Sequence, residues 1–379
     1  MALTLTSEQQ LLKDNATQFV REHAPVGHLR RLRDTKDSVG FSRDLWQQMV
    51  ELGWAGIVIP EAYGGLGLGW TELGLVIEAC GRTLAPQPLL SSVALGSALV
   101  LAGGSDAQKS SVLPAISSGR ALCAVAFEEA PRFRPYHVAC KAERVGQSYR
   151  LSGHKTFVLD GHVAQHLIVS ARTSGAIDDR NGISLFLLDA QQAGVKLERT
   201  QMLDSRNAAR CTLEAAEVPA SALLGSVDKG ADLLDPVLDR AAVLVSAELL
   251  GLISQAYETT LEYLKTRVQF DALIGSFQAL QHRAVNLFCE IELCKSLVRE
   301  ALAAQDAQRE DAPLLASAVK AKLSDAATLI SREAVQLHGG IGMTDEHDIG
   351  LYLKRAAVAE ATFGDAPYHR ARFASLKGF

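Results

Sequence analysis

Residues 149–161 read YRLSGHKTFVLDG and residues 166–173 read HLIVSART, and here the chain has no helical periodicity. Short runs rich in Val, Leu, Ile and Phe, punctuated by Gly and Asp, are typical of consecutive β-strands. Similar runs lie around them: CAVAF at 123–127, GISLFLLDA at 182–190, VKLERTQMLD at 195–204 and CTLEAAEVP at 211–219. Their spacing predicts a small all-β domain of sandwich or barrel type.

Helical periodicity surrounds this segment on both sides. From Ser7 to about Leu122 apolar residues recur at helical spacing, and Ser7 followed by Gln10 predicts a capping box. Beyond the β segment, four long helical patterns cover 233–267, 277–305, 312–339 and 349–376. Long helices with short joins predict a four-helix bundle. We therefore expect an α+β multidomain fold, with an N-terminal all-α domain at 1–121, a central β domain at 122–228 and a C-terminal four-helix bundle at 229–379.

Composition restricts the class of function. A net charge of −5 over 379 residues argues against broad nucleic-acid binding. No apolar run reaches the roughly 18 residues that a membrane span needs, and the polar N-terminal segment does not resemble a signal peptide. Six cysteines without a Cys-x-x-Cys pair indicate reduced, mostly buried thiols. These features predict a cytoplasmic protein that acts on small molecules.

Several common catalytic motifs are missing. The glycine-rich stretch PEAYGGLGLG at 60–69 is not a Gly-x-Gly-x-x-Gly after a strand, and the chain has no Walker sequence. A Rossmann or P-loop nucleotide site is therefore unsupported. No His/Glu spacing fits a zinc helix and no Gly-x-Ser-x-Gly occurs, so we predict no metal site and no serine hydrolase.

Two motifs in the C-terminal helices offer binding groups. QLHGGIGMTDEH at 336–347 ends a long helix on two glycines, which permit close approach of a ligand or simply cap the helix. In it, Gln336 and His338 can donate hydrogen bonds. RVQFDALIGSFQALQH at 267–282 places Arg267 at the end of a helix, where a guanidinium suits a pyrophosphate or merely complements the helix dipole.

In order and spacing, PEAYGGLG, the β segment, RVQFDALIGSFQ and QLHGGIG resemble the acyl-CoA dehydrogenase family over nearly the whole chain. The resemblance implies FAD bound without a Rossmann domain and oxidation of the α,β bond of an acyl-CoA. In the family, a glutamate removes the α-proton while hydride passes to flavin N5. The need for a base follows from the chemistry, because the α-proton of a thioester is only weakly acidic. The resemblance also implies a dimer or tetramer and an electron-transferring flavoprotein as partner.

The resemblance divides the FAD site between two subunits. This chain keeps the groups with which one subunit completes its neighbour's nucleotide end: Arg267, Phe270, Gln278, Gln336, Gly339 and Gly340. One departure is Asp271, where the family usually has glycine. The flavin side differs more. The stretch 127–133 replaces Thr-Glu-Pro-x-Ala-Gly-Ser, with Arg132 and Arg134 adding bulk. Phe157-Val158-Leu159 replaces Trp-Ile-Thr, so the resemblance implies that Phe157 packs against the flavin but that the hydroxyl of the motif is lost.

The family's base is missing from both of its known positions. Tyr-Glu-Gly-Thr corresponds to 362–365, so Phe363 stands where the glutamate would be, and the alternative position is Ala241. Asp365 and Glu248 are the candidates for a relocated base. Asp365 could instead bond backbone amides in a turn, and Glu248 could pair with a basic residue inside the bundle.

Three hypotheses follow. In the first, the chain is the companion subunit of a heteromeric, FAD-dependent acyl-CoA dehydrogenase and completes the FAD site of a second subunit that carries the base. In the second, it is a self-sufficient, homo-oligomeric dehydrogenase whose base is Asp365 or Glu248. In the third, it is a flavin-dependent oxygenase or oxidase of the same fold. Substrates from fatty acids to steroid side chains are compatible with the sequence.

Overall fold

The computed structural model of the protein describes residues 4–379 and divides into two compact units. The first comprises the residues up to Asp34, then Trp70–Ala85 and Ala242–Phe379. The second comprises Thr35–Gly69 and Pro86–Ala241. Each unit is therefore assembled from separate segments of the chain. The predicted order of helices, sheet and helices is confirmed.

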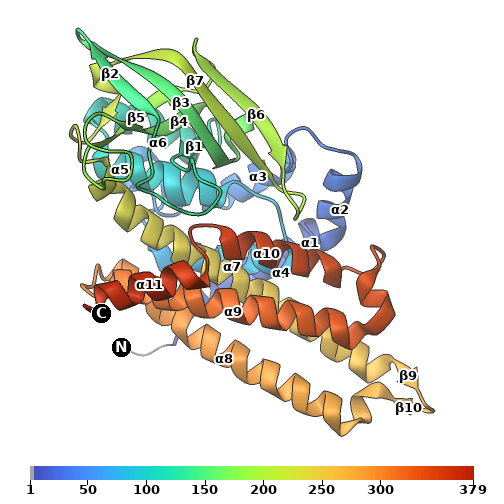
Figure 1. The fold of residues 1–379 in the computed structure, drawn as a ribbon. Coiled ribbons are helices and arrows are strands. Elements are labelled where there is room, and N and C mark those ends of the chain that lie inside the picture. Colours follow the sequence, from blue (N-terminus) through green and yellow to red (C-terminus); the bar gives the residue numbers. More distant parts are fainter. Residues whose placement is uncertain (1–3) are drawn as a thin grey trace. The chain divides into compact units, whose positions relative to one another are not determined.

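The first unit is helical. Its elements are α1 (Ser7–His23), α2 (Val26–Asp34), α4 (Trp70–Thr83), most of α7 (Gly230–Thr266), the strands β9 (Val268–Gln269) and β10 (Ala272–Leu273), α8 (Gln278–Asp306), α9 (Ala312–His338), the 3-10 helix η7 (Gly339–Met343), α10 (Ile349–Ala361) and α11 (Ala366–Leu376). Helices α8 and α9 run side by side, and α10 and α11 pack against α9 (Figure 1). Helix α4 packs against both α1 and α8.

Close packing between α4 and α7 requires glycine on both helices. A Cβ added to Gly251 would lie 1.9 Å from the carbonyl oxygen of Glu78, and one added to Gly81 would lie 2.2 Å from that of Glu248. Any side chain at either position would push the two helices apart. This crossing fixes the place of Glu248 in the core of the first unit.

Two predicted helix boundaries are wrong. The capping box at the start of α1 uses Thr6 and Gln9 rather than Ser7 and Gln10, because Thr6 has the extended backbone of a cap and its hydroxyl accepts from the Gln9 amide at 3.2 Å. The fourth C-terminal pattern, predicted as one helix, is interrupted between α10 and α11. Its interruption coincides with Phe363 and Gly364, whose φ angles of 58° and 99° no α-helix can contain.

The second unit contains the sheet and further helices. Its helices are α3 (Arg43–Glu51), the π-helix η3 (Leu89–Ser97), α5 (Ala98–Gly103), α6 (Asp106–Ser117), the 3-10 helices η1 (Trp54–Gly56), η2 (Glu61–Tyr63), η4 (Gly161–Val163) and η5 (Ala220–Ala222), and the start of α7. Segment 89–103, which lies within the stretch predicted to be helical, is thus part π-helix and part α-helix. All nine residues of η3 are buried, as the run LLSSVALGS leads one to expect.

The strands form one mixed sheet in the order β6-β7-β3-β2-β4-β5-β8, with β1 paired in parallel with β4. Their bounds are β1 (Cys123–Ala126), β2 (Lys141–Val145), β3 (Ser148–Leu159), β4 (His166–Arg172), β5 (Ile183–Asp189), β6 (Val195–Gln201), β7 (Asn207–Pro219) and β8 (Leu223–Leu224). Strand β4 is buried along almost its whole length, which explains its continuous apolar run. Strand β3 has a register shift between Lys155 and Val158 against β7.

Candidate functional site

The hairpin after α7 presents an aromatic ring to solvent. Strands β9 and β10 are joined by Phe270 and Asp271, whose φ angles are 54° and 58°. Two consecutive left-handed residues in a two-residue hairpin loop make a type I′ turn, for which Gly at the second position is preferred. Asp271 tolerates that backbone better than most residues do. The Phe270 side chain is 89% exposed and has only an edge contact with Phe277, at 6.3 Å between ring centroids.

Three hydrogen-bond donors near this hairpin are not used by the chain itself. Arg267 follows the last residue of α7, Gln278 is the first residue of α8, and Gln336 lies in the last turn of α9. All three are exposed, and within residues 4–379 their side chains have no hydrogen-bond or ion-pair partner. The donors are thus available to a molecule outside the chain.

The two glycines after α9 are open on the side where a side chain would be. Gly339 has a φ of 64°, and a Cβ added to it or to Gly340 would meet no atom within 4 Å. The φ angle explains glycine at 339, but nothing in the chain's own packing requires glycine at 340. Both glycines are exposed, so the backbone here is accessible to a bulky ligand or to another chain.

His338 does not take part in this exposed surface, contrary to the prediction that it donates outward. Its side chain is 2% exposed and stacks on Tyr263 of α7, at 4.5 Å between ring centroids. Its Nδ1 donates to the carbonyl of Ala334 at 2.8 Å. Burial lowers the pKa of His338, so the ring is neutral near pH 7. His338 therefore joins the ends of α7 and α9 and brings the flanking donors to one end of the helices.

We call this region the bundle end; it consists of Arg267, Phe270, Gln278, Gln336, Gly339 and Gly340. Its chemistry fits the nucleotide half of a dinucleotide. A guanidinium and two carboxamides can donate to phosphate and ribose oxygens, an exposed ring offers a stacking or packing face, and the glycines leave room for the ligand.

The turn at the expected base position is occupied by a buried phenylalanine. Phe363 is 1% exposed and adopts a left-handed backbone. His369 Nε2 donates to the Phe363 carbonyl at 2.8 Å, and because a carbonyl only accepts, the proton must be on Nε2. Burial lowers the pKa of His369 to about 4, opposed by this hydrogen bond. The ring therefore stays neutral.

A buried lysine also donates hydrogen bonds to the backbone of this turn. Lys320 of α9 is 0% exposed, and its Nζ donates to the carbonyls of Glu360 and Gly364, both at 2.7 Å. Burial lowers the pKa of Lys320 to about 7, while the charges of Glu360 and Asp365 act in the opposite direction. Together Lys320 and His369 provide the contacts that hold the strained backbone of residue 363.

Both candidate relocated bases already have partners. The Asp365 carboxylate caps α11 by accepting from the Tyr368 amide at 2.9 Å. Glu248 forms a buried ion pair with Arg355: Nη2 reaches Oε2 at 2.6 Å and Nε reaches Oε1 at 2.9 Å. These are the turn and the bundle pairing that the sequence offered as alternatives to catalysis. The remaining base position, Ala241, is a fully buried residue of α7.

In the second unit, the residues at the family's flavin positions are altered and partly strained. Phe157 is half-buried, with a φ of 53°, inside the register shift of β3. Glu129 accepts from the fully buried Lys155 at 2.6 Å. Its neighbour Glu128 is 8% exposed, and the Glu128 carboxylate has no hydrogen-bond or ion-pair partner among residues 4–379, so burial raises its pKa to about 8. Arg132 and Arg134 are exposed rather than buried, and Arg134 pairs with Asp178.

Sequence reasoning missed several buried charges. The buried charges are those of Lys155, Lys320 and Arg355. Their apolar neighbours in the sequence predicted buried positions but did not reveal the partners of these charges. A charged residue on a buried helical face was the available signal, since such groups are seldom buried without a partner. Arg30 and Arg33, described below, had no such signal.

Other features of the described chain are consistent with these assignments. The cysteine prediction is confirmed: all six are free and only Cys289 is exposed. Residues 4–379 contain no group of three or more His, Cys, Asp or Glu side chains arranged to hold a metal ion. Within the same residues, no helix combines the length and the apolar character needed to cross a membrane.

Comparison with known proteins gives one consistent answer. Models of the N-terminal, middle and C-terminal domains of acyl-CoA dehydrogenase match residues 6–120, 132–218 and 228–375. The chain is 30% identical to the probable acyl-CoA dehydrogenase YngJ of Bacillus subtilis (strain 168) over 381 residues, covering 98% of each chain.

Solved structures of similar chains agree. A variant of the Tcur3481-Tcur3483 steroid ACAD has a TM-score of 0.88 and 30% identity, with 99% of each chain covered. The ChsE4-ChsE5 complex from Mycobacterium tuberculosis has a TM-score of 0.89 and 26% identity, with 100% of this chain and 99% of that chain covered.

Proposed function

We propose, from the premise that this chain belongs to the acyl-CoA dehydrogenase family of FAD-dependent oxidoreductases, that it is the companion subunit of a heteromeric enzyme. In this role it completes the FAD site of a second subunit, which carries the catalytic base. The observation that carries the proposal is the combination of an open bundle end with a closed, base-less turn at Phe363.

The bundle end would hold the nucleotide part of FAD from the neighbouring subunit. Arg267 and the carboxamides of Gln278 and Gln336 would bind phosphate and ribose oxygens, and Gly339 and Gly340 would let the backbone approach. Bound FAD supplies the hydride acceptor for α,β-oxidation of an acyl-CoA. The chain's own contribution is therefore binding and orientation.

The base positions support a role without proton abstraction. Phe363 cannot take a proton, and its ring fills the space at the turn. Ala241 is apolar as well. A general base must lie within hydrogen-bond reach of its proton and must be free to accept it. Asp365 and Glu248 already have other partners, and this counts against a self-sufficient enzyme.

Assembly with another chain agrees with the exposed apolar surface of the first unit. Phe270, Phe277, Val285 and Phe288, on the hairpin and on α8, are between 37% and 89% exposed. Aromatic side chains are enriched at protein interfaces relative to the rest of the surface. Two of the similar solved structures are of paired chains, Tcur3481-Tcur3483 and ChsE4-ChsE5, and the former is named a steroid ACAD. We therefore favour a heteromer with a steroid-type acyl-CoA as substrate.

Further parts of the proposal concern electron transfer and location. Reduced FAD would be reoxidised by an electron-transferring flavoprotein. Free cysteines and the absence of disulfides among residues 4–379 favour a cytoplasmic location. A homodimer or homotetramer remains the alternative assembly, in which the same bundle end would serve an identical neighbour.

The first experiment measures the FAD content of the chain purified alone and after co-expression with a base-bearing chain of the same family. We expect little flavin and no acyl-CoA oxidation alone, and both flavin and oxidation in the mixture. The matched control is the mixture made with Arg267→Gln, which should lose flavin. Stoichiometric FAD and acyl-CoA oxidation by the chain alone would refute the companion role.

If the chain alone oxidises acyl-CoA, Asp365→Asn and Glu248→Gln identify the base. Unchanged turnover in both variants would remove the relocated-base alternative. If the chain alone holds reduced flavin that consumes oxygen without oxidising acyl-CoA, the oxygenase or oxidase alternative replaces the proposal.

A further inference from the structure

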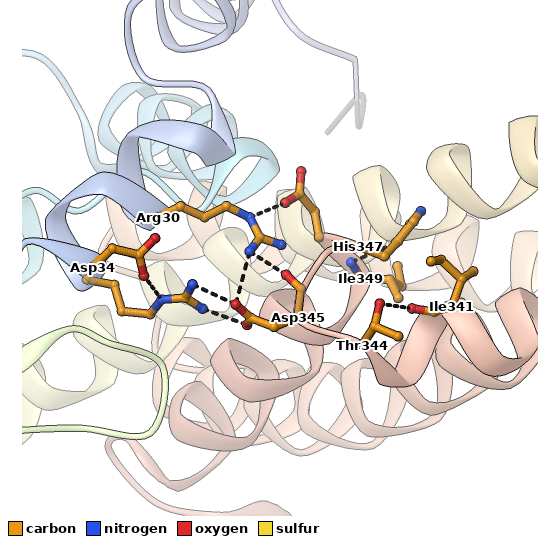
Figure 2. Close-up of polar contacts among 9 residues, drawn as sticks. Arg30, Asp34, Ile341, Thr344, Asp345, His347 and Ile349 are labelled. Atoms are coloured by element: carbon orange, nitrogen blue, oxygen red, sulfur yellow. Dashed lines mark hydrogen bonds and ion pairs between the residues drawn. The ribbon is translucent and has the colours of Figure 1, made fainter.

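The loop that follows the two glycines of the bundle end is held by a helix from the other end of the sequence. After η7 the chain passes through residues 344–348 and enters α10. Two arginines of α2, one helical turn apart, reach this loop from more than 300 residues away in the sequence. Figure 2 shows Arg30 and Asp345 pointing toward one another across this contact.

The contacts form a small network of charged hydrogen bonds. Arg33 donates from Nη1 and Nη2 to the two carboxylate oxygens of Asp345, at 2.7 and 2.8 Å, and from Nε to Asp34 at 2.7 Å. Arg30 donates to the main-chain carbonyl of Asp345 at 2.5 Å and to the Asp348 carboxylate at 2.7 Å. We call Arg30, Arg33, Asp345 and Asp348 the arginine clamp.

The clamp fixes both the side chains and the backbone of the loop. A two-pronged guanidinium–carboxylate pair restricts orientation as well as distance. The bond from Arg30 to a main-chain carbonyl also fixes the path of the chain itself. Both arginines are about one-fifth exposed, but Asp345 and Asp348 are 61% and 43% exposed, so the clamp depends on its two-pronged geometry more than on weak solvent screening.

The loop is also connected inward to the bundle end. Thr344 Oγ1 donates to the Ile341 carbonyl at 2.8 Å, which ties the loop to η7 (Figure 2). The His347 ring lies 4.3 Å from the His338 ring, and its Nδ1 accepts from the Ile349 amide at 3.2 Å. His338 directly precedes Gly339 and stacks on Tyr263. Contacts therefore run without interruption from α2 to the two glycines.

We propose that the arginine clamp positions the Gly339–Gly340 turn for the nucleotide, so that Arg30 and Arg33 are positioning residues of a cofactor site that they do not touch. This inference rests on the proposed function. An exposed turn of two glycines has many accessible backbone conformations, and a ligand that binds one of them must order the rest. The clamp reduces that cost by holding the chain on the C-terminal side of the turn.

The test compares two arginines with the same number of contacts. Arg33 makes three hydrogen bonds to two carboxylates, and so does Arg309, which binds Glu300 and Asp311 at the junction of α8 and α9. The variants are Arg33→Gln and, as control, Arg309→Gln. The first readout is amide hydrogen exchange of residues 339–349 in the free full-length chain. The second is the FAD affinity of the assembled enzyme.

We expect Arg33→Gln to speed exchange at 339–349 and to weaken FAD binding, each by about two- to fivefold, the scale of a partly exposed ion pair with two-pronged geometry. Arg309→Gln should change neither. Combining Arg33→Asp with Asp345→Arg reverses the pair, and partial recovery of protection would separate a specific clamp from general loosening.

Unchanged exchange in Arg33→Gln would overturn the clamp. Faster exchange with unchanged FAD affinity would overturn its role in positioning the turn. If no assembly of the wild-type chain binds FAD, the proposed function fails, and the positioning role with it; the exchange data still report whether the clamp holds the loop.

Discussion

The bundle end and the Phe363 turn lie in the same helical unit but have opposite physical character. At the bundle end three side-chain donors have no partner among residues 4–379, an aromatic ring is 89% exposed and two glycines face open space. At the turn, Phe363 is 1% exposed, and Lys320 and His369 occupy the backbone carbonyls around it. Exposed donors without a partner in the fold are available to a ligand or to another chain. Buried groups that are hydrogen-bonded within the fold contribute to its stability.

The free energy of unfolding should depend most strongly on the buried charges of the helical unit. Glu248→Ala would remove one carboxylate from the buried Arg355 guanidinium, and we expect a loss of about 3–5 kcal/mol in the free energy of unfolding. Urea denaturation measures this loss. The matched variant Glu248→Gln with Arg355→Met keeps the volume and removes both charges, and should recover much of it. A loss below about 1 kcal/mol in Glu248→Ala would mean that the core does not depend on the pair.

A smaller effect should come from His369 as the pH falls. Its pKa is about 4 in the folded chain and near 6.5 in the unfolded chain, so between these values the unfolded chain binds a proton that the folded chain does not. The stability that His369 contributes is thus present above pH 6.5 and is lost as the pH falls toward 4, by up to about 3 kcal/mol.

Urea denaturation of the wild type and His369→Gln at several pH values tests this. We expect the wild type to lose stability more steeply than the variant between pH 6.5 and 4. The exposed His282, replaced by Gln, is the control. Parallel curves for wild type and His369→Gln would show that the turn does not hold His369 neutral.

A substitution at the bundle end should have the smallest effect on the free energy of unfolding and a separate effect on the affinity for FAD. Phe270→Ala removes a ring that is 89% exposed, so the free energy of unfolding should change by less than about 0.5 kcal/mol. The FAD affinity of the assembled enzyme should fall about tenfold, because aromatic anchors often dominate interfaces. Calorimetric melting and FAD titration measure the two quantities. A substantial loss of stability with unchanged FAD affinity would reverse the assignment.

Local patterns in the sequence predicted the elements and the motif positions. Strand runs such as HLIVSART and helical runs such as those of α8 and α9 carry their periodicity within a few residues, so they need no tertiary information. The break at Phe363 had no such signal, because Phe seldom adopts a left-handed backbone and does so here only with Lys320 and His369 in place. Contacts across the fold decided that conformation.

The candidate site was predictable in its residue types but not in its environment. The sequence placed Arg267 and Gln336 at helix ends, and in the structure their side chains are exposed and have no partner within the described range 4–379. The sequence could not show whether Glu248 and Asp365 are free to act as bases. The partner of Glu248, Arg355, lies 107 residues away, so no local pattern reveals the pair. The arginine clamp spans more than 300 residues, and nothing in α2 marks Arg30 and Arg33 as different from other surface arginines.

The division of each compact unit into separate segments has a consequence for how the chain is made. The second unit ends at Ala241, whereas the first needs residues 242–379 to give α4 its partners α7 and α8. At ribosomal rates those residues take roughly seven to thirty seconds to synthesise. During that time the faces of α4 that later pack against α7 and α8 stay exposed, and exposed apolar surface of this kind is prone to aggregation. A stalled or truncated translation product would therefore release a folded sheet unit attached to unprotected helices.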